Sequence, residues 1–331
     1  MDDNISGGFF EETKVEKTEV AEIPQVVSIE AKEVLKKVKT ISYSQYAKWL
    51  KCPQSWKLSY IDNLDKFESS INTAFGKAIH TAVQLFLKTL YTEGAIAADS
   101  LELIELFNKE YDAEAAKITD EKPTKEVLEE FRQDGETILK YFTSPSNRLK
   151  HFPSKVFEVI GVELPLKVPI RGGTIMYKGF LDIVLKEKST GKIHILDFKT
   201  STYGWNKWQK MDRTKLDQLL LYKRFYNQVY KTPMNDIEIE FIVLKRKLYE
   251  DVGFPQQRIQ RISPTDGKIS IKEVERTFLD FINDCFDSFG EFNKDKPYIK
   301  NPGKGKKNCK YCPFATLLDK DGNKVCDQIE G

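Results

Sequence analysis

An aspartate and a lysine two positions apart, Asp197 and Lys199, interrupt the apolar run IHILDFKTS at residues 193–201. Because side chains alternate across a strand, both charges would project from the same face. The preceding run YKGFLDIVL contains Asp182, and antiparallel pairing would bring it near Asp197. Two carboxylates in a partly apolar setting repel each other unless a hard divalent cation lies between them. The pattern indicates a metal site; the alternative is a salt bridge at a strand end with Asp182 capping a turn.

Helices and strands that would position these charges follow from the periodicity of apolar residues. We expect helices at 45–61 (capped by Ser44), 75–90, 99–118, 124–142, 213–230 and 270–289. We expect strands at 155–170, 174–187, 192–200, 237–247 and 256–262. Helices before, between and after the strands predict an α/β fold with a central mixed β-sheet flanked by helices and a helical N-terminal part.

The domain organisation follows from composition along the chain. With 331 residues and 40% hydrophobic content the chain can build a substantial core. Residues 1–38 are rich in charge and are predicted to be a flexible tail. The remainder, 39–331, is predicted to be a single domain, with a mainly helical part (39–150), an α/β core (151–265) and a C-terminal helix with a cysteine-rich segment (266–331).

Charge and cysteine usage limit the classes of partner and compartment. Lysine and arginine number 52 against 50 acidic residues, so nucleic-acid or membrane binding would need local patches. The start MDDNISGGFF lacks the basic residues of a secretory signal, and no run approaches the ~20 apolar residues of a membrane span. Five cysteines without a signal argue against disulfides and for metal or cluster ligation in a cytoplasm, a host cytoplasm if the gene is viral. Phe9 and Phe10 in the tail could dock a replication or recombination partner, or be incidental aromatics in a solvated tail.

Four ordered motifs over residues 40–331 resemble the RecB-type branch of the PD-(D/E)XK nuclease superfamily. They are a GxxxH on a helix, a GxxD on a strand, a DxK on the next strand and a QxxxY on a later helix. In this sequence they are FGKAIH with Gly76 and His80, GFLD with Gly179 and Asp182, DFKT with Asp197 and Lys199, and QLLLY with Gln218 and Tyr222. The resemblance implies a restriction-endonuclease-like core and hydrolysis of phosphodiester bonds in DNA.

The same resemblance implies roles for the motif residues. It makes Asp182, Asp197 and the carbonyl of Phe198 ligands of Mg²⁺ or Mn²⁺, and the nitrogen of His80 would favour Mn²⁺. Lys199 would orient the attacking water, stabilise charge on the phosphate or act as a base.

Gln218 and Tyr222, one helical turn apart, could contact the DNA backbone or support Lys199. They could instead form a polar edge on a packed helix, as His80 could be a histidine at the boundary of an apolar stripe. Glu163, on the strand before GxxD, is expected to have a supporting or structural role.

The cysteines form a separate pattern. Cys309, Cys312 and Cys326 lie near the C-terminus, and Cys52 lies more than two hundred residues earlier. A lone CxxC could be a zinc, redox or accidental feature. The four together resemble the iron-sulfur subset of these nucleases, such as the AddB-type and CRISPR adaptation nucleases, which implies a [4Fe-4S] cluster stapling the two ends. Thirteen residues separate Cys312 from Cys326, more than is usual in that subset, and Cys285 is predicted to be a buried structural thiol.

Basic and aromatic residues suggest where nucleic acid would bind. Residues 293–310 carry Lys294, Lys296, Lys300, Lys304, Lys306, Lys307 and Lys310 against one acid. Tyr298 and Tyr311 there, and Trp205 and Trp208 after the DxK strand, could stack on bases. The alternatives are a solvated basic loop and tryptophans packed against the sheet.

These expectations together describe a metal-dependent DNA nuclease. The family resemblance further implies an exonuclease on single-stranded or end-processed DNA in replication, recombination or repair. Without a GxxxxGK[ST] motif the chain shows no helicase motor. The alternative is a non-catalytic DNA-end-binding or interaction module that keeps a structural four-cysteine site, with iron-sulfur or zinc. Intact acids argue against a binder, since they repel phosphate.

Overall fold

The computed structural model describes residues 38–64, 69–119, 122–310, 312–319 and 322–326. The predicted docking residues Phe9 and Phe10 lie outside this part of the chain. Within it, no helix combines the length and apolar character that crossing a membrane requires.

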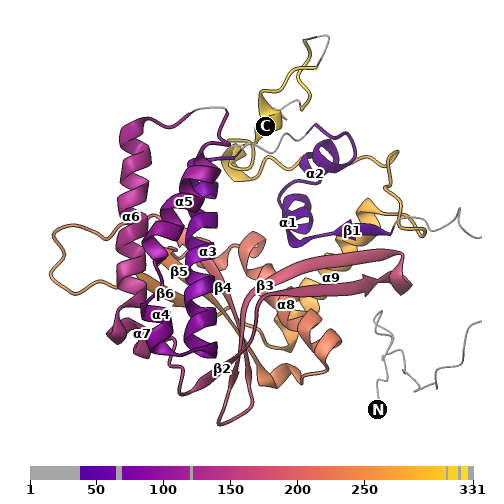
Figure 1. Ribbon diagram of the computed structural model, residues 1–331. Helices are drawn as coiled ribbons and strands as arrows, with labels where there is room; N and C mark the ends of the chain where they lie inside the picture. The colour runs from indigo at the N-terminus through magenta and orange to yellow at the C-terminus, as the bar shows by residue number, and fades with distance from the viewer. Residues whose placement is uncertain (1–37, 65–68, 120–121, 311, 320–321, 327–331) are drawn as a thin grey trace, which may run out of the picture.

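The described residues form a six-stranded mixed sheet in the order β1-β3-β4-β5-β6, with β2 paired to β3 off this path. The strands are β1 (Lys39–Ile41), β2 (Phe157–Ile170), β3 (Ile175–Glu187), β4 (Ile193–Ser201), β5 (Ile237–Lys245) and β6 (Ile259–Ile262). β4 pairs antiparallel with β3 and parallel with β5. Figure 1 shows β2 and β3 as a long hairpin that extends beyond the rest of the sheet.

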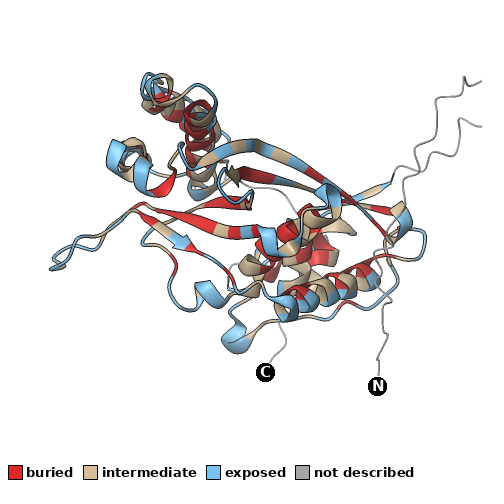
Figure 2. Cartoon of the chain, turned by 90° about the horizontal axis from the view of Figure 1, so that it is seen from below, coloured by how far each residue is buried: buried red, intermediate tan, exposed pale blue. Residues whose placement is uncertain are grey.

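Helices cover both faces of this sheet (Figure 1). They are α1 (Tyr43–Lys51), α2 (Pro53–Tyr60), α3 (Ile71–Thr92), α4 (Ala95–Asp99), α5 (Leu103–Ala115), α6 (Lys125–Thr143), α7 (Pro145–His151), α8 (Arg213–Tyr230) and α9 (Lys268–Cys285). Their apolar sides form two cores. One joins α3, α5 and α6 to Leu196 and Phe198 of β4, and the other joins α1, α2, α8 and α9 to Ile193 and Ile195. Figure 2 shows the buried residues concentrated along the sheet and the helix sides that face it. The result confirms the predicted α/β layers.

The first helical region differs from expectation. The predicted single helix capped by Ser44 is two helices, and the N-cap of α1 is Ser42. Cys52 breaks them, with extended φ −162° and ψ 107°, because Pro53 disfavours a helical conformation in the residue before it. The break places a cysteine at the junction of two helices.

The pairing of β3 leaves an opening in the sheet. β2 accompanies β3 along its length, but on its other edge β1 pairs with Ile175–Tyr177 and β4 pairs with Ile183–Lys186. On this edge of β3, residues 178–182 have no paired strand in the part of the chain that the structure describes. The candidate site lies at this divergence of the strands.

Candidate active site

Asp182 and Asp197 come together as the alternation of the strands predicts. The antiparallel register that pairs Ile183 with Leu196 sets the two aspartates across from each other on β3 and β4. Asp182 is 9% exposed and Asp197 is 2% exposed. Asp182 Oδ2 accepts a 2.7 Å hydrogen bond from the backbone N–H of Phe198. The alternative in which Asp182 merely caps a turn is therefore wrong.

Lys199 lies beside Asp197, with Nζ 2.5 Å from Oδ2 of the carboxylate. The contact lacks hydrogen-bond geometry, and among the described residues Asp197 Oδ2 is a buried atom without a hydrogen-bond partner. An acceptor in that state is costly unless a donor or a cation meets it. The Lys199 ammonium is the cation that meets this oxygen here, and a hard divalent cation at the acids would take over that role.

The electrostatics of the pair point the same way. Burial, followed by the neighbouring charge of Asp197, raises the pKa of the Asp182 carboxyl well above its usual range. Lys199 and the Phe198 amide act in the opposite direction and only partly offset these effects. A bound cation would stabilise the charged form of Asp182 against this burial and repulsion. Perturbed carboxyls of this kind are common at functional sites.

His80 of α3 reaches the same acids from the other side of the sheet. Its Nδ1 lies 3.6 Å from Oδ2 of Asp182. Burial lowers the pKa of His80, so the imidazole is neutral at neutral pH and has a lone pair to offer. Gly76, one turn earlier, lies against β4, and a Cβ there would make an ordinary 3.6 Å contact with Thr200 Oγ1.

Ligand geometry is not preformed. Among the described residues, no group of three or more His, Cys, Asp or Glu side chains is arranged so that it could hold a metal ion. His80 contacts Asp182, while the carboxylate of Asp197 is engaged by Lys199. The residue types and burial fit a divalent cation, and binding one would require Asp197 to turn from Lys199.

Glu163, which was expected to have a supporting or structural role, lies on the strand next to Asp182. The pairs Val162–Ile183 and Leu164–Leu181 flank it, so it lies across from Asp182 on β2. Its φ of 50° is left-handed, next to an irregularity in the register at Gly161. Glu163 Oε1 accepts a 2.5 Å hydrogen bond from Nε2 of Gln84. Gln84 was missed in the sequence, although its spacing of four residues from His80 is a signal.

Gln218 and Tyr222 of α8 form a bonded pair, with Gln218 Nε2 donating to the Tyr222 hydroxyl at 3.1 Å. Tyr222 is 4% exposed. Burial, and secondarily Asp197, raises the pKa of Tyr222, so the phenol keeps its proton. A Cβ at Gly179 would lie 3.2 Å from the Tyr222 ring, which explains the glycine of GxxD by close packing. The two residues belong to the surroundings of the acids, not to a solvated edge.

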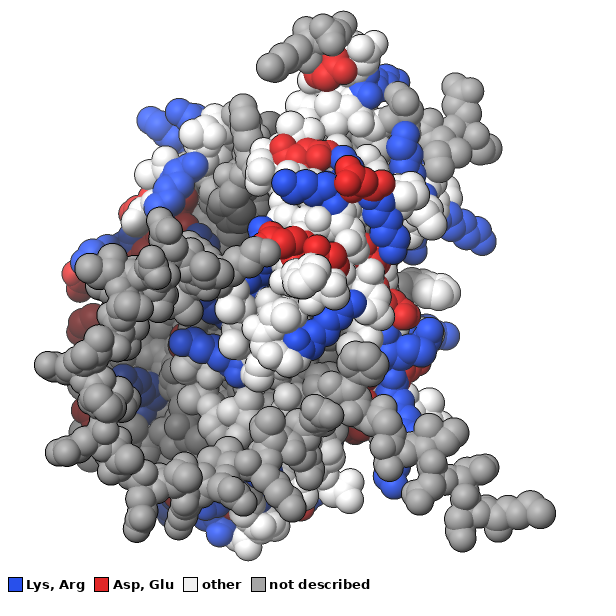
Figure 3. Space-filling view, turned by 90° about the vertical axis from the view of Figure 1, so that its right-hand side faces the viewer, with Lys and Arg blue, Asp and Glu red and all other residues white. Residues whose placement is uncertain are grey.

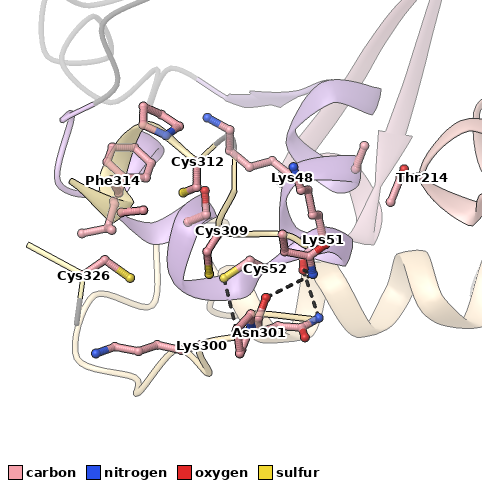
Figure 4. Close-up of a pocket in the computed structure, with 17 residues that line it drawn as sticks. Lys48, Lys51, Cys52, Thr214, Lys300, Asn301, Cys309, Cys312, Phe314 and Cys326 are labelled. Carbon is pink, nitrogen blue, oxygen red and sulfur yellow. Dashed lines mark hydrogen bonds between the residues drawn. The ribbon is translucent and has the colours of Figure 1, made fainter. Parts of the chain in front are cut away.

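The four cysteines of the predicted cluster line one pocket of about 330 Å³ (Figure 4). In Figure 4 the sulfurs of Cys52 and Cys309 point toward each other, and Cys312 and Cys326 lie on the same side of the α1–α2 junction. All are free thiols, and burial raises the pKa of Cys309 and Cys326. The four thiols line one cavity, but the described cysteines are not arranged as a group that could hold a metal ion, so the predicted cluster stays a prediction. Cys285 is fully buried in the core, as predicted.

Two of the aromatic residues expected to stack on bases are instead packed in the fold. Tyr298 is 7% exposed and lies 5.6 Å from Trp56 between ring centroids. Trp205 is 6% exposed and packs on Phe241. Trp205 thus follows the packing alternative, and both rings belong to the core and are not available to stack on bases. Tyr311 lies outside the described residues, and Trp208 is 75% exposed.

Comparisons with known proteins identify the family of the chain and a structure with the same fold. Residues 40–317 match the family described as the PD-(D/E)XK nuclease superfamily, and the chain belongs to it. No curated protein matches the sequence. A solved structure from Eubacterium rectale, named "Putative exonuclease", has a TM-score of 0.50 at 12% identity. The match covers 90% of this chain and 96% of that one, which shows a shared fold.

Proposed function

We propose that the chain is a divalent-metal-dependent DNA exonuclease of the RecB-type branch of its superfamily. The observation that carries the proposal is the facing pair Asp182 and Asp197, both buried, with Lys199 Nζ 2.5 Å from Oδ2 of Asp197. A nuclease needs carboxylates that hold metal cations at the phosphate. A protein that only binds DNA gains nothing from acids, because they repel phosphate. The exonuclease assignment also draws on the name of the Eubacterium rectale protein.

In this proposal Asp182, Asp197 and the Phe198 carbonyl hold Mg²⁺ or Mn²⁺, with His80 as a nitrogen ligand. A bound divalent cation supplies positive charge to the phosphate oxygens and lowers the pKa of water. Lys199, 33% exposed at its side chain, positions the attacking water or neutralises charge that develops on the phosphate. The Gln218–Tyr222 pair, joined by its 3.1 Å hydrogen bond, either supports Lys199 or contacts the DNA backbone.

The cysteine pocket is proposed to hold a [4Fe-4S] cluster with Cys52, Cys309, Cys312 and Cys326 as ligands. Its support is the shared cavity of four thiols drawn from both ends of the described chain. A cluster there would cross-link the α1–α2 junction to the C-terminal segment. Zinc is the alternative occupant, and a broad visible absorption of the purified protein decides against a zinc-only site.

The setting follows from the same features. Five free thiols suit a reducing cytoplasm, where the nuclease would act in replication, recombination or repair. A protein partner from those processes would bind through the N-terminal tail with Phe9 and Phe10.

End-labelled single- and double-stranded DNA, incubated with Mn²⁺ or Mg²⁺, tests the activity. We expect progressive loss of labelled ends with wild-type protein and none in EDTA. Asp182→Asn, Asp197→Asn and Lys199→Ala should each abolish cleavage while the melting temperature is retained. If wild-type protein binds DNA ends without cutting them in either metal, the non-catalytic binding module replaces the nuclease.

A further inference from the structure

A groove separate from Asp182 and Asp197 lies between the segment that follows β4 and residues 293–310, the lysine-rich loop. Its volume is about 930 Å³. The walls are residues 206–214, which lead into the first turn of α8, residues 50–51 at the end of α1, and residues 301–308. Nothing in the roles assigned above to the acids or the cysteines uses this groove.

The chemistry of the groove is basic and aromatic. Lys51, Lys304 and Lys307 line it, and none forms an ion pair with the described residues. Trp208, 75% exposed, and Met211, 61% exposed, supply apolar surface. The two other charged residues of the lining are engaged elsewhere. Asp212 caps α8 by accepting from the Thr214 N–H at 3.0 Å, and Arg213 pairs with Asp217 and Glu273.

The groove is built by specific contacts. The side chains of Asn301 and Asn308 both donate to the carbonyl of Lys51, at 3.0 and 3.1 Å, which ties the lysine-rich loop to α1 (Figure 4). On the opposite wall, Asn206 Oδ1 accepts from the N–H groups of Trp208 and Gln209, at 3.0 Å each. Both walls are therefore held in place before a ligand arrives.

Helix α8 connects the groove to the acids. Thr214 lines the groove, and Gln218 and Tyr222 follow it at intervals of four residues, so the three share one helical face. With a rise of 1.5 Å per residue, Gln218 lies about 6 Å and Tyr222 about 12 Å along the axis from Thr214. A strand of nucleic acid spans that distance in a few nucleotides.

We propose that this groove binds single-stranded DNA and delivers it to Asp182 and Asp197. The proposal rests on the proposed nuclease function and names the form of its substrate. The lysines contact phosphates and Trp208 stacks on an unpaired base. Stacking of this kind requires a base without a partner, which favours a single strand over a duplex. On the face that Figure 3 shows, Lys and Arg are interspersed with acidic and uncharged residues, so that face has no broad basic surface.

Binding without hydrolysis tests the groove directly. Wild-type protein in EDTA is titrated into a fluorescein-labelled oligothymidylate, and anisotropy is followed at several salt concentrations. Trp208→Ala should weaken binding about 5- to 100-fold, the range for loss of one stacked base. Lys304→Ala/Lys307→Ala should reduce the slope of log K against log salt by about 1.4, because two phosphate contacts are lost. Duplex of the same length should bind more weakly than the single strand.

Matched controls separate the groove from general charge and hydrophobicity. Phe254→Ala removes an aromatic that is 65% exposed on the β5–β6 connection, and Lys88→Ala/Lys150→Ala removes two exposed lysines from α3 and α7. All four proteins should keep the wild-type melting temperature, and the controls should keep wild-type affinity.

The outcomes distinguish this proposal from the nuclease assignment. If Trp208→Ala and the double-lysine variant bind as the controls do, or duplex binds as tightly, the groove proposal is overturned even where cleavage is intact. If binding depends on Trp208 and the lysines but wild-type protein cuts nothing, the groove stands and the nuclease assignment falls.

Discussion

The backbone N–H of Phe198 donates a 2.7 Å hydrogen bond to Oδ2 of Asp182. The residue between Asp197 and Lys199 thus fixes the carboxylate of the neighbouring strand. This contact helps to set the relative position of the two acids, and the same oxygen of Asp182 also lies 3.6 Å from Nδ1 of His80. Because an amide oxygen can accept the same bond, the charge of Asp182 can be removed without losing this contact.

Asp182→Asn separates function from stability. Loss of a metal-ligand charge should lower the cleavage rate by about 10²–10⁴-fold, the scale of several kcal/mol of transition-state stabilisation. In EDTA the same change should leave the melting temperature unchanged or raise it by about 1–3 °C, because a buried like-charge repulsion disappears. Scanning calorimetry with and without Mn²⁺ measures both effects.

Lys186→Gln, at a half-exposed position of the same strand, is the control for Asp182→Asn. Mn²⁺ should stabilise the wild type and this control but not Asp182→Asn. A lower melting temperature of Asp182→Asn in EDTA would show that the aspartate is a structural ion pair.

The pH dependence of stability has a definite sign. The folded-state pKa of Asp182 is raised, so the folded protein holds this proton more tightly than the unfolded chain. Stability from this group is complete below the ordinary carboxyl pKa of about 3.9 and is lost as pH rises through the raised value. In EDTA the wild type should therefore fall below Asp182→Asn as pH rises from about 4. Urea unfolding of both proteins at matched pH measures the difference, and a gap that narrows with rising pH contradicts the assignment.

Much of the fold could be predicted because its strands and helices have strong periodicity. The predicted helix 213–230 has the bounds of α8, and β2, β3 and β4 begin and end within two residues of expectation. β1 could not be predicted, since the three residues Lys39–Ile41 are too few to show alternation.

The residues of the site that belong to sequence motifs could be predicted. The residues placed there by tertiary packing could not. Asp182 and Asp197 meet because register follows from alternation. The left-handed φ of Glu163 depends on an irregularity at Gly161, of which the glycine is the only local sign. Tyr298 looked like a loop aromatic because its partner Trp56 is 242 residues away in the sequence. Such contacts arise from tertiary structure and leave no local pattern.

Glu163→Gln tests whether Glu163 supports the metal site. The substitution keeps an oxygen for the Gln84 amide but removes a negative charge near Asp182 and His80. We expect Mn²⁺ affinity to fall about 10- to 100-fold, as when an outer contact of a metal site is lost. Isothermal titration calorimetry measures it. Glu158→Gln makes the same change at an exposed position of β2 and should leave affinity unchanged, and equal affinities in both variants exclude the role.

Asp217→Ala should be the most destabilising change in α8. Asp217 is fully buried and accepts from Tyr46 Oη at 2.7 Å and from Arg213 Nε at 2.7 Å, joining α1 to α8. Removing it leaves a half-buried guanidinium and a buried phenol without their partner, at a cost of about 3–5 kcal/mol in the free energy of unfolding. Urea denaturation measures this cost.

Glu273→Gln tests the second, exposed ion pair of Arg213. Glu273 is half exposed and pairs with Arg213, so its loss should cost less than about 1 kcal/mol. Equal costs for Asp217→Ala and Glu273→Gln would show that burial of Asp217 does not determine its contribution.

Cys52→Ser tests the cluster at its most distant ligand in the sequence. Cys52 ends α1 and lines the pocket with Cys309, Cys312 and Cys326. If the four hold a [4Fe-4S] cluster, Cys52→Ser should lose visible absorbance and bound iron. It should also lose about 2–5 kcal/mol of stability, the scale of a cross-link that closes a long loop. Because Asn301 and Asn308 attach the lysine-rich loop beside Cys52, single-strand binding should weaken as well.

Cys285→Ala is the matched control, since this buried thiol lies in the core away from the pocket. It should keep colour, iron content and single-strand affinity, with a modest loss of stability from the missing sulfur. Colourless wild-type protein with one zinc per chain would replace the cluster by zinc. Full colour in Cys52→Ser would remove Cys52 from the ligand set and with it the staple between the two ends of the chain.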